Sequence, residues 1–218
     1  MNFKKLIFRL SAALLVGLAW AGSARADIVV VSGNVPQVDE NVLLNTGSTG
    51  NPIFGLTNMT QLSVRFTGQE TLTAPANGQA RVTAATGTFN NLTIDLSSAT
   101  SGAATGTFTS LILNPDAVAD GTLTITVTED NGMVNTFSLL ALSGSGQNFF
   151  TITAVAGQRI RSVNIASNVE LADVAQVRIG GAQQQQQPIP EPMTMLLLGT
   201  GLAGVAAKVR RHRKGAAE

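Results

Sequence analysis

The chain has no cysteine, no tyrosine, one tryptophan and one histidine. Without cysteine it can form neither a disulfide nor a cysteine-ligated metal site, so an apolar core alone must stabilise the fold. The single histidine, His212, lies in the basic C-terminal segment. The middle of the chain therefore lacks the histidine that a Ser-His-Asp triad or a histidine-ligated metal site needs. We expect no metal and no cofactor there. Its aromatic residues are all phenylalanines, which we expect in the core because they lack a polar group.

Lysine is also absent from the middle of the chain. All four lysines, Lys4, Lys5, Lys208 and Lys214, lie near the ends. Between Asp27 and Ile189, five arginines face eleven acidic residues, which gives this part a formal charge of −6 although the whole chain carries +1. Phosphate binding needs clustered cations, so this composition excludes nucleic acid as a partner.

The N-terminus has the pattern of a secretory signal peptide. Lys4 and Lys5 precede an apolar stretch from Leu10 to Trp20, and Ala24-Arg25-Ala26 has the small-x-small pattern of a signal peptidase site. The alternative is an uncleaved membrane anchor, but the stretch is shorter than the ~20 apolar residues that a spanning helix needs. We therefore expect residues 1–26 to engage the export machinery and to be removed after Ala26.

The C-terminus combines an apolar run with a basic end. Residues Met193 to Ala207 would form a helix of roughly 22 Å, against a hydrocarbon core of ~30 Å. Five cations follow at once: Lys208, Arg210, Arg211, Arg213 and Lys214. Such clusters stay on the cytoplasmic side, so the run predicts one short transmembrane helix with the middle of the chain exported.

Just before this run stand Pro190, Glu191 and Pro192. The triplet, the apolar run and the basic end together resemble the PEP-CTERM sorting signal of Gram-negative bacteria, here over 190–214. The resemblance implies a substrate of exosortase, a membrane-embedded cysteine transpeptidase-like enzyme of cells that make exopolysaccharide and biofilm. It implies an inner-membrane precursor with a periplasmic ectodomain and a mature form at the cell surface or outside it. The alternative is a proline-rich linker before an ordinary tail anchor.

Residues 27–181 have the composition and periodicity of an antiparallel β fold. Apolar residues recur with period two or in short bursts between Gly- and Asn-rich turns. We expect a two-sheet, jelly-roll-like β-sandwich followed by a flexible Gln-rich linker over 182–189. The predicted strands are 28–31, 42–45, 62–67, 79–84, 92–96, 106–113, 122–128, 134–142, 148–154, 158–165 and 175–179.

The segment 121–142 predicts a hairpin. Leu123, Ile125 and Val127 alternate with threonines, and a three-residue loop ending at Gly132 would pair Ile125 with Phe137 and Leu123 with Leu139. A two-residue Asn-Gly turn would instead leave Phe137 in solvent. We adopt the three-residue loop, with Gly132 at a position of positive φ.

Later strands are less regular. Ile160 breaks the phase of Arg161, Val163 and Ile165, which predicts a bulge or a strand buried on both faces. Further on, Ala175, Val177 and Ile179 are expected on one face, with Gln176 and Arg178 on the other. Residues 168–174 could form one helical turn.

Four acidic residues near the hairpin, Asp116, Asp120, Glu129 and Asp130, are the candidates for chemistry. They could bind Ca²⁺ or act as a glycosidase pair. No ligand spacing supports either, and the neighbouring Asn-Pro, Asp-Gly and Asn-Gly pairs form turns in any case. The expectation is therefore solvated turns and a protein that is not an enzyme.

These observations predict an exported, non-enzymatic cell-surface or extracellular matrix protein. It would be processed by exosortase and associated with exopolysaccharide in a biofilm, with extracellular polysaccharide as a candidate partner. A lectin-like carbohydrate-binding module is the alternative, although tyrosine and tryptophan, the usual sugar-stacking residues, are missing. An exported hydrolase is a third class and would require convergent acids.

Overall fold

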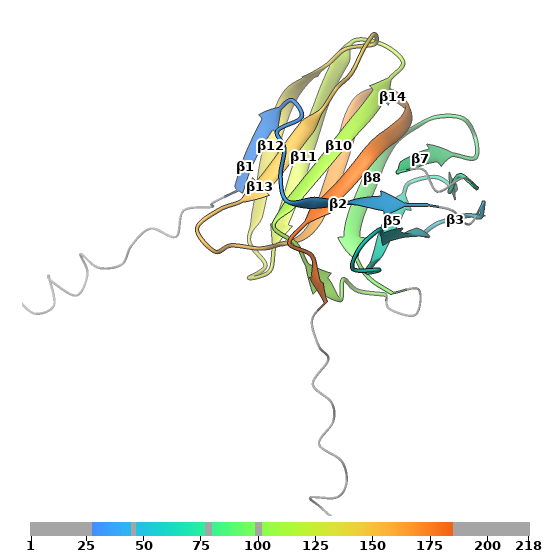
Figure 1. The fold of residues 1–218 in the computed structure, drawn as a ribbon. Helices are drawn as coiled ribbons and strands as arrows, with labels where there is room; N and C mark the ends of the chain where they lie inside the picture. The colour runs from blue at the N-terminus through green and yellow to red at the C-terminus, as the bar shows by residue number, and fades with distance from the viewer. Residues whose placement is uncertain (1–27, 45–46, 77–79, 99–101, 185–218) are drawn as a thin grey trace, which may run out of the picture. The chain divides into compact units, whose positions relative to one another are not determined.

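A computed structural model describes residues 28–44, 47–76, 80–98 and 102–184. These residues form strands, turns and loops, and the described part contains no helix (Figure 1). Within it there is accordingly no helix long and apolar enough to cross a membrane. The predicted signal peptide and transmembrane segment lie outside the described residues. Up to Gln183 the chain is one compact unit, and residues 184–218 are grouped as a second.

The described residues form fifteen strands. Seven precede residue 85: β1 (Ile28–Ser32), β2 (Asp39–Leu43), β3 (Thr49–Gly50), β4 (Ile53–Thr57), β5 (Ser63–Gly68), β6 (Leu72–Thr73) and β7 (Arg81–Ala84). Eight follow: β8 (Phe89–Leu96), β9 (Gly106–Thr107), β10 (Ser110–Ala117), β11 (Gly121–Glu129), β12 (Val134–Leu142), β13 (Phe150–Ala154), β14 (Ile160–Gly180) and β15 (Gln183–Gln184). The all-β prediction is confirmed.

The long strand β14 organises the sheet. Its first half, from Ile160, pairs with β11 on one side and β8 on the other. Its second half, up to Gly180, pairs with β10 on one side and with β7 and then β2 on the other. Since β2 pairs with β4, β4 with β5 and β5 with β8, these strands return to β14 and close a small barrel-like ring. Thirteen of the strands thus form one continuous sheet that folds back on itself, and β9 and β15 form a separate two-stranded sheet.

The core lies inside this folded sheet. Phe66, Phe89, Phe108 and Phe150 are among its largest fully buried side chains, together with leucines and isoleucines from most strands. Leu123, Ile125 and Val127 are fully buried, and the threonines between them are partly exposed. This is the expected alternation of a strand with one buried face.

The predicted hairpin is confirmed near its loop and wrong at its far end. Ile125 pairs with Phe137, and Gly132 has a φ of 88°. Leu123, however, pairs with Leu140 and not with Leu139. Leu139 is the extra residue of a β-bulge, with a φ of 60° and 80% of its surface exposed. The turn sets the register of the hairpin near its loop, and the bulge shifts that register by one residue further along the two strands.

The prediction for 158–179 also changes. Residues 168–174, expected as a possible helical turn, belong to β14, which runs unbroken from Ile160 to Gly180. The predicted bulge near Ile160 is present, because Ile160 and Ser162 face the adjacent residues Glu129 and Thr128 of β11, leaving Arg161 between them. Further register shifts let this one strand bend through both halves of the sheet.

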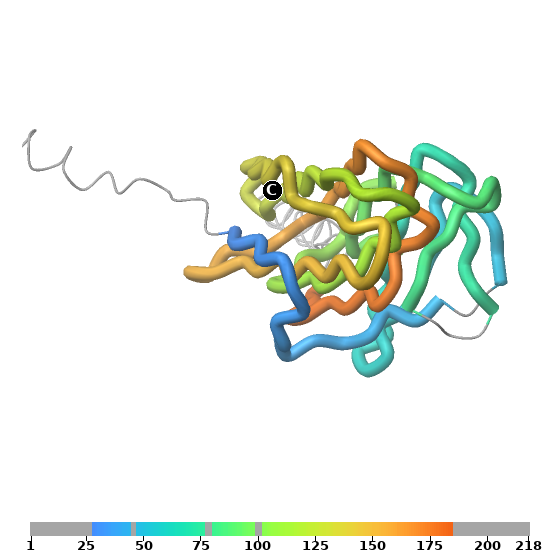
Figure 2. Tube along the Cα trace, turned by 90° about the horizontal axis from the view of Figure 1, so that it is seen from above, coloured from blue at the N-terminus to red at the C-terminus, as the bar shows by residue number. Residues whose placement is uncertain are grey.

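One further feature positions the site described below. The segment between β1 and β2 runs along the outside of the sheet (Figure 2), where the backbone amide of Val35 donates to Oγ1 of Thr151 at 3.0 Å. At the other end of the domain, Gln183–Gln184 forms β15 and pairs with β9. This part of the expected flexible spacer is thus strand.

Candidate functional site

The sorting residues predicted from the sequence lie outside the described residues. This holds for Pro190, Glu191 and Pro192, for Lys208, Arg210, Arg211, Arg213 and Lys214, and for the signal peptidase residues Ala24 and Ala26.

The four candidate acids do not form one site. Asp120 precedes β11 and accepts a hydrogen bond from the backbone amide of Gly144 at 2.8 Å, whereas Glu129 ends the same strand. Eight residues of extended chain separate Gly121 from Glu129, or about 26 Å. Glu129 is only 1% exposed and accepts hydrogen bonds from the side-chain amides of Asn131 and Asn135. Within the described ranges, no three acidic or histidine side chains are placed to hold a metal ion.

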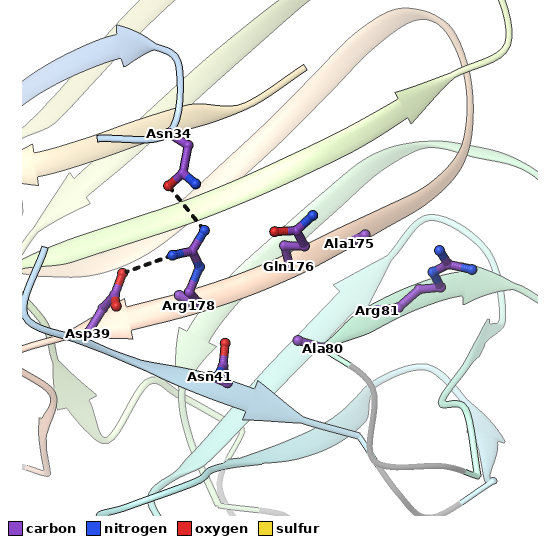
Figure 3. A pocket seen from close by; sticks show the side chains of 8 residues that line it. All are labelled: Asn34, Asp39, Asn41, Ala80, Arg81, Ala175, Gln176 and Arg178. Carbon is purple, nitrogen blue, oxygen red and sulfur yellow. Dashed lines mark hydrogen bonds and ion pairs between the residues drawn. The ribbon is translucent and has the colours of Figure 1, made fainter. Parts of the chain in front are cut away.

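A polar pocket of about 580 Å³ lies elsewhere, along β14 (Figure 3). We call it the β14 pocket. It is lined by side chains from the β1–β2 segment, β2, β14 and the start of β7: Asn34, Asp39, Asn41, Ala80, Arg81, Ala175, Gln176 and Arg178. One acid, two arginines and three amides thus surround two alanines, with no aromatic or large apolar side chain.

The pocket occurs where β14 changes its partner. Ala175 pairs with Arg81 of β7, and Arg178 pairs with Asn41 of β2. The two residues between them have no strand partner on that side, although the amide of Val177 donates to the carbonyl of Ala80 at 3.3 Å. The interruption leaves room for side chains at the surface.

Backbone geometry turns Gln176 toward this gap. Gln176 has a φ of 52°. Together, Gln176 and Val177 of β14 face a single residue of β10, Leu113, and so form a β-bulge. This bulge changes the phase of the strand, so Val174 and Val177 are both fully buried although three residues apart. Ala175, predicted on the face of Val177, instead lines the pocket with Gln176 and Arg178. The prediction for Ala175 was wrong because simple alternation does not allow for the bulge.

Arg178 is held by two residues of the approaching chain. Its Nη2 donates to Oδ1 of Asn34 at 3.1 Å, and its Nη1 lies 3.9 Å from Oδ2 of Asp39. The side chains of Arg178 and Asp39 are 21% and 13% exposed, and Oδ2 of Asp39 is buried without a hydrogen-bond partner. Gly180 permits this close approach, because a Cβ there would lie 2.6 Å from the carbonyl oxygen of Val38. These two contacts fix the orientation of the Arg178 guanidinium and use only part of its N–H donors.

Arg81 forms the other end of the pocket. Its Nε lies 3.4 Å from Oδ2 of Asp173, while 48% of its side chain is exposed. Burial raises the pKa of Asp173, the charge of Arg81 opposes this shift, and neighbouring Asp116 adds to it. The contact to Asp173 uses Nε of Arg81, and about half of the Arg81 side chain remains exposed; Figure 3 shows Arg81 at the β7 end of the pocket lining.

The sequence predictions did not identify this pocket. Its residues come from four segments between Asn34 and Arg178, and no short motif connects them. One signal was present, since three-residue spacing of Val174 and Val177 indicates a bulge in a strand. The chemistry of the pocket suits binding by hydrogen bonds and charge. The described residues place no histidine, cysteine or pair of free carboxylates in it.

Comparison with known proteins adds one specific match. The PEP-CTERM protein-sorting motif matches residues 188–211. No curated protein matches the chain. Among solved structures, it is similar to one titled "CpGH89CBM32-6 produced by Clostridium perfringens", with 12% identity over 73% of this chain and 97% of the other and a TM-score of 0.30. A second is the enzymatically active domain of tailspike protein 4 of bacteriophage CBA120, with 14% identity over 71% of this chain and 19% of the other and a TM-score of 0.26.

Neither structural likeness is close enough to inform function. The sorting motif is informative, because it implies an exported protein directed to the cell surface and processed by exosortase. Its boundaries contain the triplet at 190–192 and most of the basic end. The chain is thus identified as a protein that carries the PEP-CTERM protein-sorting motif, at residues 188–211.

Proposed function

We propose that this chain is a non-enzymatic surface or extracellular matrix protein that pauses in the inner membrane, is cut by exosortase near Pro190 to Pro192, and then acts outside the cell. The observation that carries the proposal is the sorting motif over 188–211. Export by a cleaved signal peptide and association with exopolysaccharide in a biofilm are parts of the same proposal.

The residues of the motif have a physical rationale. Pro190 and Pro192 fix φ and remove two backbone donors, so we expect this segment to be extended and to remain outside the predicted helix that follows. Glu191 is then presented at the membrane face. The apolar run after it is short and contains Gly199, Gly201 and Gly204, which lower its helix propensity. A weak anchor held by cations at its inner end suits a temporary stop in the membrane.

The non-enzymatic part of the proposal is supported by the dispersed acids. Asp120 and Glu129 lie at opposite ends of β11, and Glu129 is enclosed by two asparagine amides. A glycosidase needs two carboxyl groups about 5–9.5 Å apart across one bond. This pair does not meet that requirement.

The sorting proposal is tested with Glu191→Ala, expressed in the native cell with an epitope in the ectodomain. We expect the variant to accumulate as the longer precursor, because the enzyme loses its acidic recognition group. The matched control is Glu218→Ala, which removes the last acid of the tail and should mature normally. Deleting the exosortase should give the same precursor as Glu191→Ala. Normal C-terminal maturation of Glu191→Ala would refute the recognition role of this residue.

A second candidate function, carbohydrate binding, is favoured by the β14 pocket. Its three side-chain amides and two arginines are the hydrogen-bonding groups that a hydroxyl-rich ligand requires. Binding of an extracellular polysaccharide there would retain the processed protein in the matrix. This candidate predicts that the purified protein binds glycans, independently of how its C-terminus is processed.

A further inference from the structure

We propose that the β14 pocket binds a carboxylated saccharide, with Arg178 and Arg81 contacting carboxylates and Asn34, Asn41 and Gln176 contacting hydroxyls. The inference assigns a ligand class to the second candidate function and rests on that function. It does not depend on the sorting signal.

The first step concerns the arginines. Five lie within the described residues, and three of them are engaged in holding the fold. Arg65 pairs with Asp95, Arg159 donates to Thr107 and to the carbonyl of Gly181, and Arg161 donates to the carbonyl of Asp130. The remaining two, Arg81 and Arg178, both line the β14 pocket. Each of these two cations lies beside an acid, Asp173 or Asp39, so the pocket concentrates guanidinium donors without a net positive charge.

Both guanidinium groups retain donors for a ligand. A guanidinium has five N–H donors, and a carboxylate accepts two of them side by side. For Arg178, one short hydrogen bond, to Asn34, and one longer ion-pair contact, to Asp39, leave donors over. For Arg81, the contact to Asp173 uses Nε, and 48% of the side chain is exposed. Each arginine can therefore receive one carboxylate.

The spacing favours an extended ligand. Arg81 pairs with Ala175 of β14, and because of the bulge Ala175 and Arg178 face Asn114 and Ile112 of β10, only about 7 Å apart along the strand. In Figure 3, Gln176 of β14 lies between Arg178 and Arg81. A chain with an acidic group on more than one unit, and hydroxyls between, matches this row of guanidinium, amide and guanidinium groups.

The lining also selects against other ligands. Only the methyl groups of Ala80 and Ala175 are apolar, so a lipid chain or a nucleobase would find no surface to pack against. An added peptide strand is disfavoured, because only Gln176 and Val177 of β14 lack a strand partner at the pocket and the amide of Val177 already donates to the carbonyl of Ala80. Densely charged phosphate polymers are disfavoured by the acidic domain around the two arginines.

Strained backbone at Gln176 is an independent observation. A positive φ for a residue other than glycine, asparagine or aspartate is uncommon inside a strand and costs free energy. Here it places an amide side chain at the centre of the pocket. Such outliers occur preferentially at binding sites, where the orientation of one side chain outweighs the strain.

The test is calorimetric titration of the purified full chain in detergent with oligogalacturonate and oligomannuronate. We expect at least one of them to bind and its fully methyl-esterified form, in which the carboxylates are uncharged, not to bind. Arg178→Gln should weaken binding roughly tenfold or more, and the more exposed Arg81→Gln less. The matched control Arg161→Gln, an arginine outside the pocket, should bind like the wild type. Melting temperatures of all variants establish that they are folded.

Four results would overturn the proposal. One is the absence of binding to both uronate series, and another is equal binding of the esterified form. The third is unchanged affinity in both Arg178→Gln and Arg81→Gln. Equal or tighter binding of oligoglutamate would assign the pocket to an acidic peptide and would also overturn the saccharide class. Because Arg81 is half exposed, its variant keeps the test valid if Arg178→Gln does not fold.

Discussion

Nη2 of Arg65 lies 2.8 Å from Oδ2 of Asp95, in a cross-strand pair that joins β5 to β8. The two side chains are 13% and 5% exposed. Burial raises the pKa of Asp95, and the hydrogen bond and charge of Arg65 oppose that shift. The pair thus lies where β5 joins β8 in the barrel-like ring, and each of its two buried charges is compensated by the other.

Arg65→Met should destabilise the domain by about 3 kcal/mol, because it leaves the carboxylate of Asp95 buried without its cation. Chemical denaturation of the purified chain measures this change. The double variant Arg65→Met/Asp95→Leu should recover most of the loss, since two apolar side chains can pack where two charges were removed together. A double variant less stable than Arg65→Met would show that the ion pair itself is a large net stabiliser.

Glu40 should make stability depend on pH in the acid range. Its carboxylate accepts hydrogen bonds from the backbone amides of Met59 and Thr60, at 2.8 and 2.6 Å, and from Oγ1 of Thr60. Burial raises the pKa of Glu40, but these donors outweigh it and hold the pKa below its ordinary value of 4.5. A carboxyl group with a lowered folded pKa contributes stability above its unfolded pKa and loses it as the pH falls through the folded value.

Glu40→Gln should therefore cost about 1–2 kcal/mol at pH 7, and the difference from the wild type should shrink below pH 4.5. Urea unfolding at a series of pH values provides the measurement. The control is Glu170→Gln, an exposed acid of β14. A difference between wild type and Glu40→Gln that is constant down to strongly acidic pH would contradict the assigned role.

Gly132 should be needed for its backbone conformation alone. It has a φ of 88°, and a Cβ added there would meet nothing within 4 Å. Gly132→Ala should therefore cost about 1–2 kcal/mol through strain without a clash. Gly102 is the matched control, because it also has open space but no positive φ. If the two alanine variants have the same melting temperature, the hairpin does not require a left-handed residue at this turn.

Leu139 offers the opposite experiment. Its φ is 60°, its side chain is 80% exposed, and it contributes little to the core. Leu139→Asn should raise the melting temperature, because asparagine tolerates positive φ and stabilisation of up to about 1 kcal/mol is expected. Val134→Asn, an exposed position of the same strand without positive φ, should not stabilise. A fall in stability for Leu139→Asn would indicate that the exposed leucine makes contacts that matter.

Gly132 and Leu139 show how much of this hairpin could be predicted from the sequence. Alternating aliphatics and threonines predicted β11, and the Asp-Asn-Gly loop predicted the pairing of Ile125 with Phe137 and the positive φ of Gly132. These are local properties of periodicity and turn geometry. Leu139 was placed wrongly because nothing in its own segment distinguishes a bulged leucine from a buried one. Its conformation depends on how β11 fits simultaneously to β12 and β14.

The candidate site divides in the same way. Residues 188–211 form a contiguous signal, and the motif was recognisable without any fold. The β14 pocket was not, since Asn34 and Arg178 meet only after β14 has exchanged β7 for β2 as its partner. The merging of two predicted strands into β14 was missed for a related reason. A bulge keeps a long strand paired but changes which of its side chains face the core. Over a short stretch of sequence, such a strand therefore looks like two separate strands.

The central claim concerns the two ends of the mature protein. Mass spectrometric mapping of both termini of the protein recovered from native cells tests it most directly. We predict a chain that begins at Asp27 and yields no peptide from 193–218. Recovery outside the cell of polypeptide that extends to Glu218, with the basic tail intact, would contradict the account.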